Sequence, residues 1–229
     1  MASTRLSGKV MARLGPHTLL GHCVRRLQAA QVGPVVVATT TRDDDDVIEC
    51  EARRLQCEVV RGPVDDVLGR FVMVSLAFPS RWIVRATADN PAVDIESSQR
   101  LLRALEDSSA DYGLEMGLPY GAAVEVVAAG ALRRTAGLTT SPHDREHVTP
   151  FVRDHPETFA VIRPDVPADL WRPELRLTVD TAEDLEFMRK VLARADNGPD
   201  PASLQALIGA AEEVLGERGK TPSSPAHRG

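Results

Sequence analysis

Apolar and polar positions alternate along the chain in two repeating patterns. Short runs rich in β-branched residues, at 33–41 and 57–62, are typical of strands buried on both faces of a parallel sheet. Between and after them, residues 42–56 and 64–78 carry apolar side chains at helical spacing. Parallel strands need crossovers of about this length, a dozen or more residues. The pattern therefore predicts an α/β fold with a largely parallel sheet.

The rest of the chain continues this alternation and then departs from it. Further helices are predicted at 16–31, 94–108, 181–195 and 202–217, and further strands at 81–91, 110–116, 159–164 and 174–180. Residues 118–134 predict a loop, a short strand and a helix, and the polar segment 141–157 predicts a helix interrupted at Pro150. We expect one main domain over 1–195, a helical extension over 196–217 and a disordered tail over 218–229.

Composition narrows the possible functions. The 229 residues carry a net charge of −6 and no basic stripe, which argues against a nucleic-acid or anionic-membrane surface. No apolar run approaches the ~18 residues of a membrane span, and no signal peptide is evident. The cysteines (Cys23, Cys50 and Cys57) lack metal-ligand spacing, so we expect buried thiols in a reducing compartment. A cytoplasmic protein is predicted.

Polar residues follow the predicted strands where an open parallel sheet binds its ligands. They lie in segments 39–42, 61–66 and 85–90 and at Asp180, and the polar loop 1–9 is expected beside them. In such sheets, ligands bind at the carboxyl ends of the strands, near the point where strand order reverses. Segments distant in the sequence therefore converge on one predicted site.

The N-terminal loop has the composition of an anion-binding turn. Ser3, Thr4, Arg5, Gly8 and Lys9 combine hydroxyls, small residues and two cations ahead of a predicted helix. Backbone N–H groups in such a turn form a concavity for phosphate, with Arg as a planar fork and Lys as a point charge. The alternative interpretation is a disordered, cationic N-terminus.

Two aspartates are candidates for a metal site. Asp89 and Asp180 each follow a predicted strand, and Mg²⁺ takes one or two protein carboxylates together with substrate phosphates. Asp180 could equally be an ordinary residue of a helix N-terminus. The run Asp43–Asp46 is not predicted to bind metal, because acids in the first turn of a helix already complement its dipole.

Seven segments, taken together and in order, resemble a known family. They are STRLSGKV (3–10), VVATTTRDDD (36–45), RGPVDDVLGRF (61–71), VRATADNPAVD (84–94), GAAVEVV (121–127), DREHVTPFV (144–152) and LRLTVDTAEDLEFMRKV (175–191). The chain resembles cytidylyltransferases of the spore-coat polysaccharide F type, relatives of CMP-acylneuraminate and CMP-ketodeoxyoctonate synthetases. The resemblance spans residues 1–195 and implies a Rossmann-like nucleotide-diphospho-sugar transferase fold, with a mostly parallel mixed sheet flanked by helices, often as a homodimer.

The resemblance also implies a reaction and a set of site residues. An acceptor oxygen would attack the α-phosphate of CTP, with Mg²⁺ as cofactor, and release pyrophosphate. The implied nucleotide-binding residues are Ser3, Thr4, Arg5, Gly8, Lys9, Thr39, Arg61, Arg85 and Thr87. The implied acceptor-binding residues are Glu125, Arg145, Glu146 and His147. The implied catalytic residues are Arg5, Lys9, Asp89 and Asp180, of which the two aspartates hold the metal.

Departures from the family pattern leave the substrate open. Ser7 replaces a usual proline, Ala88 a usual glycine and Ala123 a usual aspartate. Loss of that carboxylate beside the implied acceptor pocket means that the acceptor is either a sugar acid or a phosphonate. Two alternatives to a CTP-dependent enzyme remain: a nucleotide-binding relative without turnover, and a nucleotidyltransferase that uses another nucleotide.

The family pattern also places a buried central strand immediately before the phosphate-binding loop. No such strand precedes residue 3 in this sequence. We therefore expect the first central strand to be missing from the sheet of this chain, and Met1 to correspond to an internal methionine of a longer natural protein.

Overall fold

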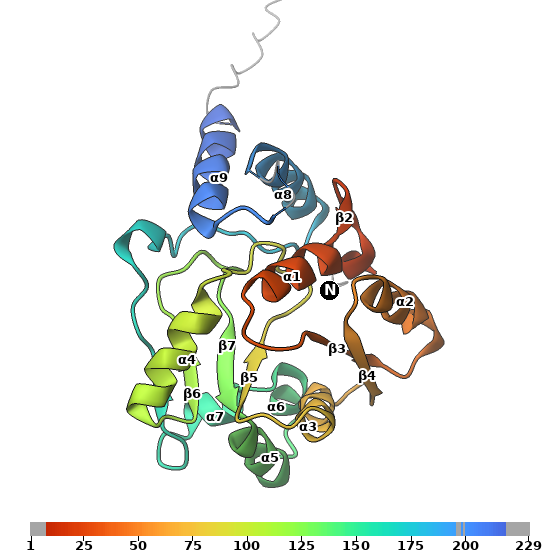
Figure 1. Ribbon diagram of the computed structural model, residues 1–229, viewed down its shortest axis with the longest axis vertical. Helices are drawn as coiled ribbons and strands as arrows, with labels where there is room; N and C mark the ends of the chain where they lie inside the picture. Colours follow the sequence, from red (N-terminus) through yellow and green to blue (C-terminus); the bar gives the residue numbers. More distant parts are fainter. Residues whose placement is uncertain (1–7, 196–197, 199, 219–229) are drawn as a thin grey trace, which may run out of the picture.

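The computed structural model describes residues 8–195, 198 and 200–218 and contains most of the predicted elements (Figure 1). The strands are β1 (Arg13–Leu14), β2 (His17–Thr18), β3 (Val36–Thr40), β4 (Glu58–Gly62), β5 (Trp82–Arg85), β6 (Tyr112–Leu114), β7 (Glu125–Ala128) and β8 (Val161–Ile162). The α-helices are α1 (Leu19–Ala29), α2 (Asp46–Arg54), α3 (Val67–Ala77), α4 (Ser97–Ser108), α5 (Ala129–Leu138), α6 (Pro142–His147), α7 (Pro150–Asp154), α8 (Ala182–Ala195) and α9 (Leu204–Arg218). Short 3-10 helices are η1 (Lys9–Met11), η2 (Asp43–Asp45) and η3 (Ala168–Leu170).

The strands form separate sheets rather than the single sheet expected. The largest has the order β5-β7-β6-β8, in which β7 is antiparallel to both of its neighbours and β6 is parallel to β8. Strands β3 and β4 pair in parallel, from Val36 opposite Glu58 to Thr40 opposite Gly62. A small antiparallel hairpin joins β1 and β2. The α/β class is therefore confirmed, but the sheets are fragmented and mixed.

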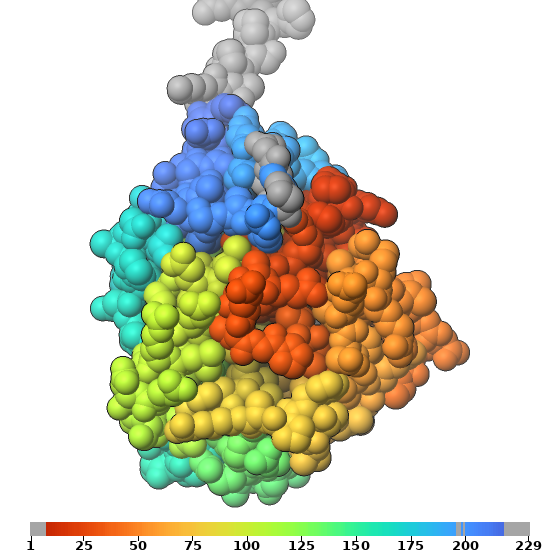
Figure 2. Space-filling model, viewed as in Figure 1, coloured from red at the N-terminus to blue at the C-terminus, as the bar shows by residue number. Residues whose placement is uncertain are grey.

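An apolar groove separates β3 from β5. Among the described residues, each of these strands has a strand partner on one side only. The groove has a volume of about 480 Å³ and is lined by side chains that include Val36, Phe71 and Trp82. A smaller hollow of about 220 Å³ shares several of these lining residues and reaches Thr87 and Ala88. Figure 2 shows the red, orange and yellow segments meeting around hollows in the surface. The groove lies between β3 and β5, which belong to different sheets.

The predicted strand over 174–180 is wrong. Only Arg176 in this segment forms a β-bridge, with Tyr120. The neighbouring chain forms a turn directly afterwards, in which Gly121 adopts φ +94° and Ala122 N donates to Pro119 O at 2.9 Å. A single bridge cannot continue into a ladder beside a turn.

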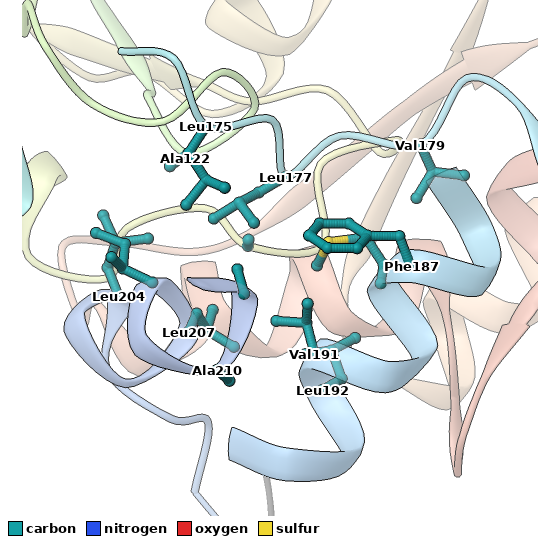
Figure 3. Close-up of a cluster of buried hydrophobic side chains, with 14 of the residues drawn as sticks. Ala122, Leu175, Leu177, Val179, Phe187, Val191, Leu192, Leu204, Leu207 and Ala210 are labelled. Atoms are coloured by element: carbon teal, nitrogen blue, oxygen red, sulfur yellow. The ribbon is translucent and has the colours of Figure 1, made fainter. Parts of the chain in front are cut away.

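The two C-terminal helices complete the largest apolar cluster (Figure 3). Phe187 and Val191 of α8 and Leu204 and Leu207 of α9 are buried together with Leu177 from the segment that precedes α8. Burying apolar surface stabilises the folded state by about 25 cal/mol per Å². The described part of the predicted extension is therefore packed against the main core.

Some expectations are corrected or lie outside the described residues. Cys23 and Cys57 are buried as predicted, but Cys50 is exposed, because it lies on the outer face of α2. Ser3, Thr4 and Arg5 and the tail beyond residue 218 lie outside the described residues. Within residues 8–195, 198 and 200–218, no helix is long and apolar enough to cross a membrane.

Candidate active site

One lysine and two aspartates, far apart in the sequence, meet in a compact cluster. Lys9 Nζ donates to Asp89 Oδ2 at 2.8 Å and to Asp180 Oδ1 at 2.7 Å. Lys9 is the first residue of η1, Asp89 lies four residues beyond the end of β5, and Asp180 lies just before α8. The predicted convergence of these three side chains is therefore observed.

Backbone contacts hold the three segments in register. Val179 N donates to Asp89 O at 3.0 Å, which joins the segment before α8 to the loop after β5. Lys9 Nζ also donates to Val179 O at 3.1 Å. Gly8, at φ +66°, adopts the left-handed conformation that turns the chain into η1. The carboxylates are thus positioned by main-chain geometry as well as by the lysine.

The cluster stabilises the charged forms of Lys9 and Asp180. Although burial opposes the charge on Lys9, its hydrogen bonds to Asp180 and Asp89 leave the pKa of the ammonium raised. The pKa of Asp180 is lowered, first by the hydrogen bond from Lys9 and also by Arg176, against the opposing effect of burial. An ammonium therefore lies where the two carboxylates would otherwise repel each other.

The carboxylates of Asp89 and Asp180 fit a hard divalent cation that takes most of its ligands from water and substrate. Asp89 Oδ1 is buried and accepts no hydrogen bond from the described part of the chain. Within that part, no group of three or more His, Cys, Asp or Glu side chains could hold a metal ion. Two carboxylates alone suit Mg²⁺, which retains waters and takes phosphate oxygens as further ligands. Asp89 and Asp180 are the residues that would hold it.

Sequence reasoning missed three residues around Asp180. Arg176 Nη2 donates to Asp180 Oδ2, and the Arg176 guanidinium lies over the ring of Tyr120, 5.0 Å from its centroid. Asp184 Oδ2 accepts from the N–H groups of Asp180 and Thr181, both at 2.9 Å. Thr181 and Asp184 have the spacing of a capping box, with Asp in place of the usual Glu. This pattern is visible in the sequence and could have identified Asp184. Nothing in the local sequence pairs Arg176 with Tyr120.

Two predicted nucleotide-binding residues lie on the β3–β4 sheet and are held by acids. Arg61 Nη1 donates to Asp46 at 2.5 Å and to Glu49 at 3.0 Å. Thr39 Oγ1 donates to Asp45 Oδ2 at 3.1 Å. The acidic run lies in the first turns of η2 and α2 and binds neighbouring side chains, and no metal group is found there among the described residues. Roles for Thr39 and Arg61 toward a nucleotide stay predictions.

Arg85 and Thr87 lie nearer the carboxylate cluster but have partners of their own. Thr87 Oγ1 accepts from Asn90 Nδ2 at 2.9 Å. Arg85 Nη1 is bound to Glu125 Oε2, and its guanidinium lies 5.9 Å from the centroid of the Phe71 ring. Both residues follow or end β5, as the sequence predicted.

Glu125, a predicted acceptor residue, is buried and fully engaged. Its Oε1 accepts from Tyr112 Oη and from Thr149 Oγ1, both at 2.6 Å, and its Oε2 is bound to Arg85. The structure thus shows Glu125 as the centre of a buried hydrogen-bond network at the start of β7. This network connects β5, β6 and β7 with the start of α7.

The remaining predicted acceptor residues lie in α6. Arg145 donates from Nη1 to Asp66 Oδ2 at 3.2 Å and from Nη2 to Ala136 O at 2.7 Å. Glu146 and His147 are exposed. No hydrogen bond joins these three residues to the Lys9 cluster within the described residues.

Comparison with known proteins identifies the family. A family model described as "Cytidylyltransferase" matches residues 1–207. The chain is 33% identical to spore coat polysaccharide biosynthesis protein SpsF of Bacillus subtilis (strain 168) over 90% of this chain and 89% of SpsF. A cytidylyltransferase from Leptospira borgpetersenii matches with a TM-score of 0.85 and 25% identity, over 97% of this chain and 94% of that one. A CTP complex of CMP:2-keto-3-deoxy-manno-octonic acid synthetase has a TM-score of 0.65 and 19% identity, over 84% and 94%, which supports the fold alone. The chain belongs to the cytidylyltransferase family of nucleotidyltransferases.

Proposed function

We propose that this chain transfers CMP from CTP to a small acidic acceptor, a sugar acid or a phosphonate, with Mg²⁺ as cofactor and release of pyrophosphate. The observation that carries the proposal is the contact of Lys9 with Asp89 and Asp180 in a chain of the cytidylyltransferase family. Two carboxylates, one of them with an unpaired buried oxygen, and a flanking ammonium suit a metal-bound triphosphate.

The reaction needs positioning and charge neutralisation more than covalent chemistry from the protein. A bond forms between an acceptor oxygen and the α-phosphorus, and the bond from that phosphorus to the β-phosphate oxygen breaks. Pyrophosphate leaves, and the proton of a hydroxyl acceptor passes to solvent. Lys9 is positioned to neutralise charge that develops on the leaving phosphates. Asp89 and Asp180 would hold Mg²⁺, which would supply Lewis-acid stabilisation of the phosphate oxygens.

The test is pyrophosphate release in the presence of Mg²⁺, with CTP, UTP, GTP or ATP and a panel of acceptors. The panel contains 2-keto-3-deoxy-manno-octonic acid, an alkylphosphonate and a neutral hexose. We expect activity with CTP and at least one acidic acceptor and none with the hexose. Asp89→Asn should lower kcat by at least about 100-fold, because one metal-binding carboxylate is lost while the shape is kept.

Asp107→Asn is a matched control, since Asp107 is an exposed carboxylate of α4. It should leave turnover unchanged. Pyrophosphate release with GTP but not with CTP would show that GTP, and not CTP, is the nucleotide substrate. CTP binding in calorimetry without turnover on any acceptor would favour a non-catalytic nucleotide-binding protein. A homodimer and a cytoplasmic location stay predictions, drawn from the resemblance and the composition.

A further inference from the structure

The exposed side chain of Arg176 stacks on the exposed ring of Tyr120, beside the carboxylate cluster. The side chain of Arg176 is 44% exposed, and Tyr120 is 61% exposed. The guanidinium lies 5.0 Å from the centroid of the Tyr120 ring. Stacking of this kind orients the plane of the guanidinium without using its N–H donors. An aromatic residue this exposed makes little contribution to the core.

The backbone beneath this pair is fixed from both sides. Tyr120 N donates to Leu175 O and Leu177 N donates to Tyr120 O, both at 2.8 Å. Gly121 lies so close to Thr178 that an added Cβ would stand 2.8 Å from Thr178 N. The Arg–Tyr pair therefore projects from a rigid junction that also carries Asp180.

Arg176 has hydrogen-bonding capacity left over. Its Nη2 donates to Asp180 Oδ2, and its Nε lies 3.5 Å from Asp184 Oδ1. Within the described residues no partner is found for Nη1, and the exposed side chain leaves this group open to a ligand. A charged guanidinium N–H suits carboxylate and phosphonate oxygens, because hydrogen bonds between an ionised donor and an ionised acceptor are stronger than neutral ones.

The other cations singled out near the site are already engaged. Arg61 is bound by two carboxylates and Arg145 by one carboxylate and a carbonyl. Arg85 is bound to the buried Glu125. Lys9 lies between Asp89 and Asp180. Among these five described side chains, Arg176 is the one that is exposed, lies next to the carboxylate cluster and has an N–H group without a partner.

Lys9 and Arg176 bind different oxygens of the same carboxylate. Lys9 Nζ is 2.7 Å from Asp180 Oδ1, whereas Arg176 Nη2 is bound to Oδ2. Lys9 itself belongs to the segment proposed to bind the triphosphate. Arg176 contacts the oxygen of Asp180 that Lys9 does not use, which leaves Arg176 available to a second substrate.

We propose that Arg176 binds the anionic group of the acceptor, a carboxylate or a phosphonate, and that Tyr120 is a positioning residue that holds the guanidinium in place. This inference rests on the proposed function and deepens it, since it assigns a recognition group for the acceptor. Neither residue belongs to the acceptor set predicted from the sequence. Under this proposal, Arg176 recognises the negative charge of the acceptor and not its sugar hydroxyls.

The experiment uses methylphosphonate as the probe and follows its ³¹P resonance as protein is added, first alone and then with CTP and Mg²⁺. Wild-type protein should bind the probe in both conditions. Arg176→Ala should raise its Kd at least about 10-fold, and Arg176→Lys should recover part of the loss. Tyr120→Phe should bind as wild type because the ring face remains, whereas Tyr120→Ala should weaken binding. Arg103→Ala, at an exposed position of α4, is the matched control.

The outcomes separate this inference from the proposed function. Unchanged probe binding in Arg176→Ala, or none in wild type, overturns the assignment of Arg176. Displacement of the probe by CTP or pyrophosphate also overturns it, because Arg176 would then serve the triphosphate. If CTP neither binds nor turns over while Arg176-dependent probe binding persists, the proposed function fails and the anion site stands. With an active acceptor, Arg176→Ala should raise the KM for the acceptor far more than the KM for CTP.

Discussion

At the scale of single residues, the geometry of Asp89 and Asp180 depends on Lys9. The three form a triad in which one ammonium separates two carboxylates, with distances of 2.8 and 2.7 Å. The sequence predicted all three as site residues, because each lies at the end of a predicted strand or in the anion-binding loop. It did not predict that Lys9 would contact both aspartates directly, since those contacts span 80 and 171 residues.

Lys9→Met should destabilise the metal-free protein and increase its response to Mg²⁺. Without the ammonium, two partly buried carboxylates face each other, which we expect to lower Tm by about 2–6 °C. Mg²⁺ then binds without displacing a lysine, so it should raise Tm more in the variant than in wild type. Calorimetry in EDTA and in Mg²⁺ measures both effects.

Lys190→Met is the control for this experiment, since Lys190 is exposed on α8. It should leave Tm nearly unchanged in both buffers. A Lys9→Met variant as stable as wild type in EDTA, or one that Mg²⁺ does not stabilise, would contradict the roles given to the two aspartates.

At the scale of elements, most predicted helices and strands form, and the failures have identifiable causes. Segment 174–180 has strand-like periodicity but pairs at one residue only, because the neighbouring chain forms a turn at Gly121 instead of an extended strand. The hairpin of β1 and β2 was not predicted, since strands of two residues leave no periodic signal. Pairing partners, rather than local preference, decide such short elements.

Gly121→Ala should destabilise the protein by about 2–4 kcal/mol. The backbone there has φ +94°, and the new Cβ would stand 2.8 Å from Thr178 N and 3.0 Å from Thr178 Cα, so backbone must shift. Urea denaturation with a constant slope gives the free energy of unfolding. Because Tyr120 is adjacent, methylphosphonate binding should weaken in this variant as well.

Gly130→Ala provides the contrasting control. Gly130 lies in α5, and nothing stands within 4 Å of an added Cβ. Alanine should therefore stabilise the helix by roughly 0.5–1 kcal/mol. Equal effects at the two glycines would mean that the close approach at Gly121 carries no strain.

At the scale of the whole molecule, the groove between β3 and β5 separates strands that differ in their number of hydrogen-bonded neighbours. Strand β7 has hydrogen-bonded neighbours on both sides, whereas β3 and β5 each have one among the described residues. Apolar side chains, such as those of Phe71 and Trp82, line the groove between the two strands. The expected absence of a central strand stays a prediction, because residues 1–7 lie outside the described residues.

Hydrogen exchange should reveal this asymmetry. Amides of Val36–Thr40 in β3 should exchange at least about tenfold faster than those of Glu125–Ala128 in β7, because edge amides open without breaking a ladder on both sides. Mass spectrometry of peptic fragments or NMR would resolve the two strands. Equal protection would show that β3 and β7 open in the same cooperative unit and that the groove does not weaken β3.

The sequence by itself determined the α/β class, the order of most elements, the family and the residues of the carboxylate cluster. These follow from local periodicity, from the polar residues that end strands and from motifs in a fixed order. Tertiary structure alone decided that β3 and β5 stand apart, that Glu125 is saturated inside the protein, and that Arg176 stacks on Tyr120 beside Asp180. The reason is physical: a pattern along the chain fixes which side chains are apolar, charged or strand-ending. Which of them meet depends on strand order and on backbone turns such as Gly121.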